Sequence, residues 1–362
     1  MDIHVIFIIF SVVLNTVSSG KHDKYAGYTV HGVHLRDVQD QRVLYELQHK
    51  LNLDMWRYGV PGDRPSLVML SPKQADVVLN ELDRYGIKHY LDVADVFWNL
   101  AEFDQNLISY RRSRSERLVP FEDYPTHAEV NAYLERVAAQ YPEIVTLVTA
   151  GKSWESRDIK YLKISTTNFT DSSKPIYFMM AMLHAREWVT TPVTLYSIHR
   201  LVENLRNEDR DLLEGTDWII LPMANPDGYE YSISDDRMWR RTRSNRPEIS
   251  TTCVGVDGNR NFDALYQPSN NPCSLTFPGP HAFSEIETRI VRDILHKYVD
   301  RIQVHLDIHS HGNYVLFPWG DGTLTPNAAQ LFHVGSVMGA AMDSMKLPSA
   351  GFYRVGNSAL IL

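Results

Sequence analysis

The sequence has 362 residues, of which 44% are hydrophobic, and its 36 Lys and Arg against 44 Asp and Glu give a net charge of −8. At about 150 residues per domain, this length favours two domains. The acidic balance argues against a dedicated nucleic-acid-binding protein, and the composition is too apolar for a disordered one. Two cysteines are too few for a disulfide scaffold or an all-cysteine metal site.

An apolar run at 5–14 lies near the N-terminus and is about half as long as a membrane-spanning helix. Small residues at 18–20 follow it, as they do at a signal-peptidase site. We interpret residues 1–19 as a secretion signal, with a buried strand as the alternative. No later run reaches membrane-spanning length, so the sequence predicts a secreted, extracellular protein without a membrane partner.

Two further features agree with secretion. Cys253 and Cys273 are a single pair, 20 positions apart, that could close a loop as a disulfide. Asn168-Phe169-Thr170 is an N-glycosylation sequon, although such triplets are common by chance.

Residues 28–95 contain one coherent pattern of strands and helices. Strands are expected at 28–35, 53–58, 66–70 and 87–93, and amphipathic helices at 40–51 and from Pro72 to Gly86. A capping box of Ser71 and Gln74 marks the start of the second helix. The order β-α-β-β-α-β predicts a ferredoxin-like α+β module with no catalytic residues of its own.

Four arginines occur in seven residues at 111–117. This segment is either a solvated linker or a cut site for a trypsin-like protease, because nicking concentrates in exposed polar linkers. The second interpretation makes residues 20–110 a propeptide, 111–117 a basic activation linker and 118–362 the functional domain.

Strands and helices alternate from about residue 122. Strands are expected at 144–149, 159–165, 175–183, 218–223 and 302–309, and helices after Thr126, at about 187–205 and at 284–299. A capping box of Ser284 and Glu287 is expected to begin the last helix. The alternation predicts an α/β fold with a mixed, largely parallel sheet flanked by helices. Sites in such sheets lie at the carboxyl ends of strands.

A metal-ligand pattern falls at one of these strand ends. His184 and Glu187 follow the strand at 175–183, and at i and i+3 they can reach one metal ion from the first turn of a helix. The triplet is weak evidence alone, because on the order of one chance match is expected. Its place at a strand's carboxyl end strengthens the interpretation.

The strand at 302–309 offers a third ligand. His305, Asp307, His309 and His311 share one face by the period of two. His309 and His311 are favoured because only the end of the strand opens on the site. Two His and one Glu around zinc leave a position for water, as in several zinc hydrolases, where the metal acidifies that water and polarises a carbonyl.

Arginines are concentrated at 237–243, and Asp257-Gly258-Asn259-Arg260-Asn261 follows within 20 residues. A charge run is usually a solvated face. Arginine's planar fork also binds carboxylates bidentately, so a zinc hydrolase with these residues near its metal could bind a substrate carboxylate.

Five segments together resemble one family, the secreted zinc carboxypeptidases of the pancreatic, digestive type. The segments are HARE (184–187), NPDGYEYS (225–232), RMWRRTRS (237–244), GVDGNRNF (255–262) and HLDIHSHG (305–312). Their order and spacing match the family over about 28–362, propeptide included.

The resemblance implies a role for each candidate residue. His184, Glu187 and His309 would bind one Zn²⁺ per chain, with Asp257 orienting His184. Arg240 would polarise the scissile carbonyl and stabilise the oxyanion. Asn259 and Arg260 would bind the substrate's terminal carboxylate, with Arg186 further out. The resemblance further implies the Cys253–Cys273 disulfide, and His311 replaces an aromatic residue usual beside the third ligand.

The resemblance also implies a glutamate general base and a substrate-capping tyrosine, and we expect both family positions to fall past Leu362. On this expectation the general base is absent, the catalytic domain is incomplete at its C-terminus, and the chain as written is weak or inactive. The side-chain preference of the substrate pocket then cannot be read from the sequence.

The resemblance favours a monomeric exopeptidase that removes C-terminal amino acids and is activated by a trypsin-like protease. The alternative is an inactive zinc-containing protein that binds peptide C-termini. A secreted structural protein is the third hypothesis.

Overall fold

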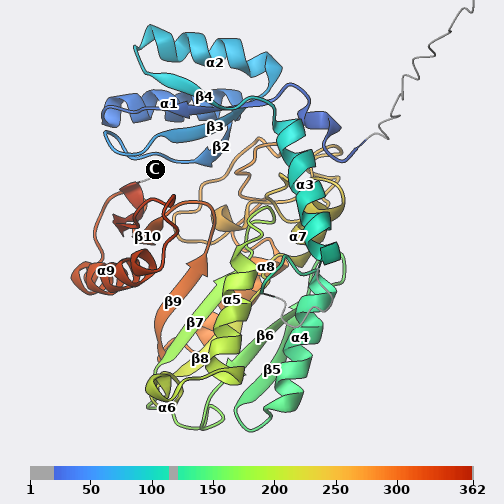
Figure 1. Ribbon diagram of the computed structural model, residues 1–362, viewed down its shortest axis with the longest axis vertical. Helices are drawn as coiled ribbons and strands as arrows, with labels where there is room; N and C mark the ends of the chain where they lie inside the picture. The colour runs from blue at the N-terminus through green and yellow to red at the C-terminus, as the bar shows by residue number, and fades with distance from the viewer. Residues whose placement is uncertain (1–19, 114–120, 361–362) are drawn as a thin grey trace, which may run out of the picture.

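The computed structural model describes residues 20–113 and 121–360, so the predicted signal and residues 114–117 of the predicted linker lie outside the described residues. Figure 1 shows an N-terminal domain above a larger C-terminal domain, with helix α3 (Val96–Ser113) running down from one to the other. Within the described ranges, no helix is both long and apolar enough to cross a membrane.

The N-terminal domain is a four-stranded antiparallel sheet with two helices on one face (Figure 1). Its elements are β1 (Thr29–Val33), α1 (Val38–Leu51), β2 (Asp54–Arg57), β3 (Ser66–Leu70), α2 (Pro72–Arg84) and β4 (His89–Val93). The strand order β2-β3-β1-β4 is that of the expected ferredoxin-like module. The predicted capping box begins α2, with the backbone N–H of Ser71 donating to Gln74 Oε1 at 3.1 Å.

The two faces of this sheet carry separate apolar clusters. One cluster, which includes Val33, Val68 and Leu70, lies under α1 and α2. The other gathers Val30 and Met69 with residues of α3 and with Met238 of the C-terminal domain. The N-terminal domain therefore packs on the C-terminal domain through the face that its own helices leave uncovered.

Helix α3 was not predicted, and its last residues overlap the start of the linker expected at 111–117. Arg111 and Arg112 form its last turn. Arg111 donates to the Asp123 carboxylate at 2.7 Å and to the Tyr124 carbonyl at 2.6 Å. Arginine is a good helix former, and its positive charge is favourable at a helix C-terminus. The first two arginines of the basic segment therefore continue the helix.

Helix α3 also packs on the C-terminal domain through an aromatic residue. The ring of Phe103 lies 6.0 Å from the indole of Trp188, which is buried. The guanidinium of Arg237 lies 3.9 Å from the Trp188 ring centroid and 5.5 Å from that of Phe103.

The C-terminal domain is built on a five-stranded sheet of order β5-β6-β8-β7-β9. The strands are β5 (Val145–Lys152), β6 (Asp158–Ile164), β7 (Ile176–Ala181), β8 (Asp217–Leu221) and β9 (Ile302–Ile308). The pairings of β7 with β8 and β9 are parallel, and those among β5, β6 and β8 are antiparallel. The predicted mixed sheet flanked by helices is confirmed, with parallel and antiparallel pairings in equal share.

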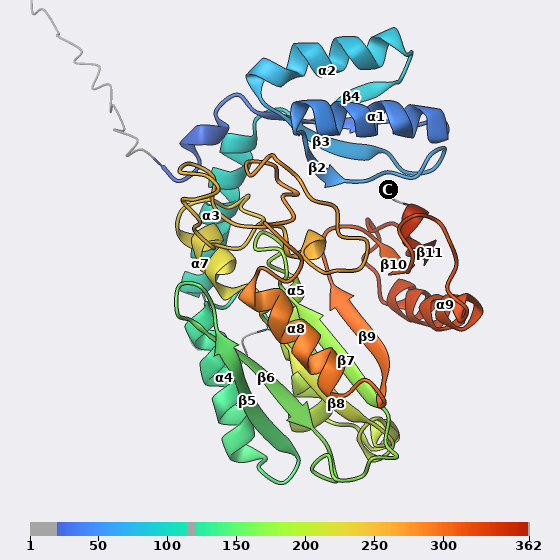
Figure 2. The same ribbon diagram turned by 180° about the vertical axis from the view of Figure 1, so that it is seen from behind.

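Helices cover both faces of this sheet. The described helices are α4 (His127–Gln140), α5 (Thr190–Ile198), α6 (Asp211–Glu214), α7 (Pro226–Ser234), α8 (Ile286–Lys297) and α9 (Ala328–Ser344). Helices α4 and α5 lie on the face seen in Figure 1, and α8 lies on the face seen in Figure 2. Helix α9 packs on a small parallel pair, β10 (Tyr314–Phe317) and β11 (Arg354–Asn357).

Two expected helix starts were wrong. The helix expected from about 187 begins at Thr190 and continues beyond Ile198 as a π-helical turn, His199–Glu203. The expected capping box at Ser284 does not form: α8 has no side-chain cap, and the Ser284 hydroxyl donates to Glu285 Oε1 at 2.8 Å instead. In a cap the Ser284 oxygen would accept a backbone N–H, but here it accepts from Asn261 Nδ2 at 2.9 Å.

Candidate metal centre

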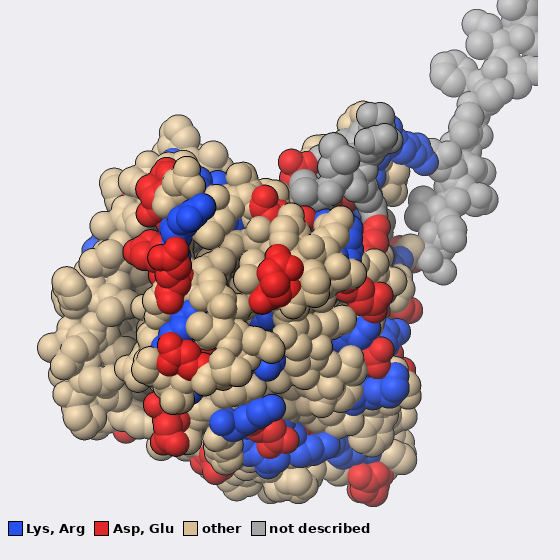
Figure 3. All heavy atoms as spheres, turned by 90° about the horizontal axis from the view of Figure 1, so that it is seen from below, with Lys and Arg blue, Asp and Glu red and all other residues tan. Residues whose placement is uncertain are grey.

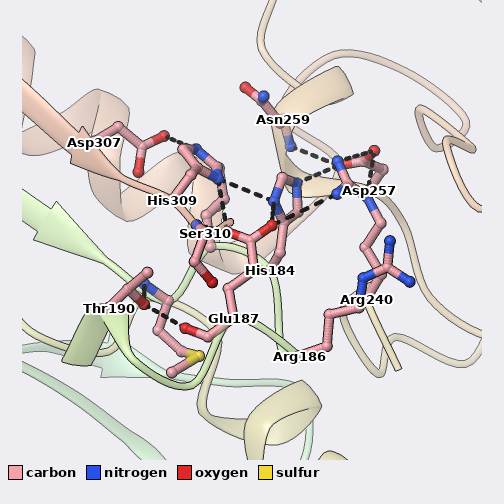
Figure 4. A network of polar contacts seen from close by, with 12 residues as sticks. His184, Arg186, Glu187, Thr190, Arg240, Asp257, Asn259, Asp307, His309 and Ser310 are labelled. Carbon is pink, nitrogen blue, oxygen red and sulfur yellow. Dashed lines mark hydrogen bonds and ion pairs between the residues drawn. The ribbon is translucent and has the colours of Figure 1, made fainter. Parts of the chain in front are cut away.

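Three side chains from two strand ends meet above the sheet (Figure 4). His184 Nδ1 lies 2.9 Å from Glu187 Oε1, and His309 Nδ1 lies 3.0 Å from both His184 Nδ1 and Glu187 Oε2. One ligand atom from each residue lies within 4.8 Å of the others, and this is the only such group among the described residues.

The turn after β7 brings the first two residues together. The N–H of Glu187 donates to the His184 carbonyl at 3.2 Å, and the Thr190 hydroxyl donates to the Glu187 carbonyl at 2.8 Å. Both residues therefore sit in a tight turn before α5, which corrects the expectation that they lie in the first turn of a helix. A tight turn and the first turn of a helix both bring residues i and i+3 together, so the spacing still predicts the pair of ligands.

A carboxylate orients each imidazole from behind. His184 Nε2 lies 2.9 Å from Asp257 Oδ1, and His309 Nε2 lies 2.8 Å from Asp307 Oδ2. A carboxylate partner makes Nε2 the proton donor, which leaves the lone pair of Nδ1 for a metal. The family resemblance implied this role for Asp257 but not for Asp307, although Asp307 shares a strand face with His309.

The electrostatics of the three residues suit a cation. Burial alone would raise the pKa of Glu187, but the imidazoles of His184 and His309 outweigh it and hold that pKa well below its usual value. Burial also lowers the pKa of His309, yet Asp307 and Glu187 together raise it well above its usual value. Two imidazole nitrogens and one carboxylate are a donor set that zinc accepts, so the residues fit a zinc ion.

Arg240 lies beside this cluster. It donates to Asp257 Oδ2 from Nη2 at 3.1 Å, and its Nη1 lies 3.7 Å from Glu187 Oε1. The N–H of Ala185 donates to the Arg240 carbonyl at 3.0 Å, so backbone contact fixes the arginine next to the histidine turn.

Arg186 points to the N-terminal domain instead. Its two terminal nitrogens donate to the two oxygens of Asp54 at 2.7 and 2.8 Å, a bidentate pair across the domain interface. Burial disfavours the charged form of Arg186, but Asp54 outweighs it and raises the pKa.

Asn259 and Arg260 follow Asp257 in a short 3₁₀ turn, Gly258–Arg260. Asp257 fixes that turn by accepting the Asn259 N–H at 3.0 Å. Both residues are exposed and line a cavity of about 360 Å³ together with Arg186 and Arg240. Asn259 also lines an adjoining cavity of about 880 Å³, on which the metal-ligand cluster opens.

The remaining sequence-predicted residues have other surroundings. The ring of His305 stacks on Phe178 with centroids 4.7 Å apart, and His311 lines the larger cavity outside the cluster. Cys253 and Cys273 form a disulfide.

The carboxylates that line the two cavities all have partners. Among the described residues they are Asp54, Glu187 and Asp307. Asp54 is held by Arg186, and the other two contact the imidazole of His309. The described part of the cavity walls therefore contains no unpaired carboxylate that could act as a general base.

Fold and site together define an α/β protein in which two histidines and a glutamate could hold a metal ion beneath a second domain. Residues 130–361 match the family model for zinc carboxypeptidase, and residues 32–97 match that for the carboxypeptidase activation peptide. The chain therefore belongs to the zinc carboxypeptidase family, whose cofactor is Zn²⁺, and carries the family's activation peptide.

Individual members of the family are similar to this chain over most of its length. Carboxypeptidase B of Helicoverpa zea is 40% identical over 359 residues, which are 96% of this chain and 83% of the relative. Carboxypeptidase A1 of Bos taurus is 31% identical, over 97% of this chain and 83% of that protein. The crystal structure of carboxypeptidase A from Helicoverpa armigera superposes with a TM-score of 0.87 at 40% identity, over 93% of this chain and 83% of that one.

Proposed function

We propose that this chain is the secreted precursor of a zinc exopeptidase in which His184, Glu187 and His309 hold the metal. The observation that carries the assignment is the pair of outward hydrogen bonds to Asp257 and Asp307, because they direct both Nδ1 atoms to one point. A bound zinc ion supplies Lewis acidity, which polarises a carbonyl and lowers the pKa of water.

The chain's own residues then bind and orient the substrate. Arg240 is held by Asp257 beside the metal-ligand cluster, where its fixed cation can stabilise a developing oxyanion. Asn259 and Arg260 line the adjoining cavity, where an amide and a guanidinium suit a terminal carboxylate. The substrate class that follows is a peptide or protein with a free C-terminus.

The N-terminal domain would block that cavity in the precursor. Asp54 gives Arg186 the bidentate carboxylate partner that a substrate would otherwise provide. Met55 and Tyr58, which follow Asp54, line both cavities. We therefore assign inhibition of the precursor to the Asp54 carboxylate and to the residues that follow it in the chain.

Further contacts would hold the N-terminal domain in place after a cut near residues 111–117. Tyr25 donates to Asp236 at 2.6 Å, next to the arginine run, and Lys24 pairs with the same carboxylate. At the other end of the interface, Arg64 donates to the Phe352 carbonyl at 2.9 Å. Release of the N-terminal domain is therefore a step separate from cleavage.

The finer assignments are part of the same proposal. Residues 1–19 are the secretion signal, residues 20–110 the core of the activation segment, and a trypsin-like protease cuts within 111–117. The protein acts as a monomer. The basic composition of 111–117 supports the choice of protease.

The experiment that tests the function compares matched peptides with a free and an amidated C-terminus. The precursor is treated with trypsin, loaded with zinc and assayed for release of the C-terminal residue and for binding. We expect the amidated peptide to bind at least about tenfold more weakly, since a charge-assisted contact contributes about 1.5–3 kcal/mol. Equal affinity for the two peptides contradicts carboxylate recognition.

The same assay separates the second candidate, a zinc protein that binds peptide C-termini without cleaving them. In this candidate the metal-ligand cluster and the cavity residues Asn259 and Arg260 hold the peptide. Tight binding without release of an amino acid supports this candidate, and release that a zinc chelator abolishes supports the exopeptidase.

A further inference from the structure

The loop between β6 and β7 contains the one Asn-x-Ser/Thr sequon of the sequence, Asn168-Phe169-Thr170. We propose that Asn168 carries an N-linked glycan in the secreted protein. This inference rests on the secretion proposed above and on the way in which the fold presents the three residues.

The middle residue of the sequon anchors the loop. Phe169 packs against the apolar cluster between the sheet and α8, with its ring 5.8 Å from that of Tyr298. The Nζ of Lys163 lies 4.6 Å from the Phe169 ring centroid. Asn168 and Thr170, on either side, are exposed. The loop therefore partly buries Phe169, which is not modified, and exposes the two residues that define the acceptor.

The backbone of the loop is held in one shape. Asn168 and Phe169 have φ of 49° and 60°, both left-handed. The hydroxyl of the buried Ser165 accepts the N–H of Phe169 at 3.2 Å and that of Thr167 at 3.1 Å. Asn168 is thus presented on an anchored turn.

The side-chain amide of Asn168 is available at the atom that is modified. Its Oδ1 accepts one long hydrogen bond from the Thr146 hydroxyl at 3.4 Å. Its Nδ2 has no hydrogen-bond partner among the described residues. A sugar on Nδ2 therefore displaces no hydrogen bond of that nitrogen among the described residues.

The loop lies at the end of the sheet opposite the metal-ligand cluster. Strand β6 ends at Ile164 and β7 begins at Ile176, whereas His184 follows the far end of β7. Six residues of extended chain span about 20 Å. Figure 3 views the molecule from this end and shows acidic and basic side chains intermixed, without a large field of one sign. A glycan there leaves the cavities and the N-terminal domain uncovered.

The chemistry is a group transfer from a lipid-diphosphate-linked oligosaccharide, the donor of the secretory pathway. The bond between Asn168 Nδ2 and the sugar C1 forms, and the bond from C1 to the diphosphate oxygen breaks. Nδ2 loses one proton, and the lipid diphosphate leaves with the electron pair. No oxidation or reduction takes place.

The test expresses the full chain in a eukaryotic host behind a heterologous secretion signal, so that the result does not depend on residues 1–19. The wild type is compared with Asn168→Gln, Thr170→Ala and the conservative Thr170→Ser. Peptide mass spectrometry before and after an amide-cleaving glycosidase locates the glycan. We expect one glycan on the wild type and on Thr170→Ser, and none on the other two variants.

An unmodified Asn168 in the secreted wild type, or a glycan that persists in Asn168→Gln, overturns the inference. Zinc content and binding of a peptide C-terminus are measured on the same preparations, and we expect them to be equal in the wild type and Asn168→Gln. Loss of binding in every preparation contradicts the proposed function alone, because the glycan is located independently.

Discussion

At the scale of single residues, the metal centre gives the sharpest test. We expect His309→Ala to lose stoichiometric zinc after dialysis, because it removes one of three ligands whose donor atoms lie within 4.8 Å of one another. His311→Ala is the matched control and retains zinc, since that histidine lies outside the cluster. Metal analysis of both proteins measures the zinc content per chain. One zinc per chain in His309→Ala would falsify the ligand set.

Asp307 is predicted to act through His309. Asp307→Ala leaves all three ligands in place but removes the hydrogen bond at 2.8 Å that fixes the ring. Loss of such an orienting contact typically lowers metal affinity by about 10–100-fold. Competition with a zinc chelator measures the change, and unaltered affinity would show that the ring is oriented by other contacts.

Glu287 is predicted to make stability depend on pH. This side chain is buried in the first turn of α8, and its Oε1 has no hydrogen-bond partner among the described residues. Burial first, and then the Glu285 and Asp227 carboxylates, raise its pKa from the ordinary 4.5 of a glutamate to about 8. The folded state therefore favours the protonated acid.

The raised pKa of Glu287 makes the folded protein less stable at higher pH. Below a pH of about 4.5 the Glu287 side chain is protonated in both the folded and the unfolded state, so its ionisation costs no stability there, and stability is lost as the pH rises from about 4.5 towards 8. We expect the free energy of unfolding to fall by up to roughly 5 kcal/mol over this window. Urea titrations at several pH values test this. Glu287→Gln should flatten the dependence, and the exposed Glu208→Gln should leave it unchanged.

At the scale of elements, α3 changes where the first cut is expected. Arg111 is held by Asp123 and by the Tyr124 carbonyl, so its side chain is not available to a protease pocket. We expect limited trypsin digestion to cut first within 112–117 and not after Arg111. N-terminal sequencing of the larger fragment identifies the bond. A first cut after Arg111 contradicts the protection of that residue, and a first cut outside 111–117 contradicts the assignment of the linker.

The sequence predicted those helices and strands in which the spacing of apolar residues corresponds to the faces that are buried. Strand β3 was placed at its observed bounds, and β7 was recognised because a central strand buried on both faces is a continuous apolar run. Helix α3 was missed because its apolar residues serve two clusters, one in each domain, and so form no single stripe. Asp307 was missed because its role depends on the rotation of the His309 ring, which no spacing encodes.

At the scale of the whole molecule, the pair between Asp54 and Arg186 is predicted to slow release of the N-terminal domain. Asp54→Asn removes one bidentate charge-assisted contact, so we expect the nicked N-terminal domain to dissociate about 10–100-fold faster. Gel filtration at intervals after trypsin treatment measures release. Asp83→Asn is the control, since Asp83 pairs with His89 inside the N-terminal domain. Equal release rates in both variants contradict the role given to Asp54.

Helix α3 gives the precursor an intrinsic optical reporter of its own activation. Trp188 is 3% exposed, and Phe103 of α3 is one of the rings that cover it. When α3 leaves, water reaches the indole, and tryptophan emission moves to longer wavelength in a more polar environment. The shift would follow departure of the helix and not the cut itself. Trp188→Phe would remove this component while leaving the emission of the other six tryptophans.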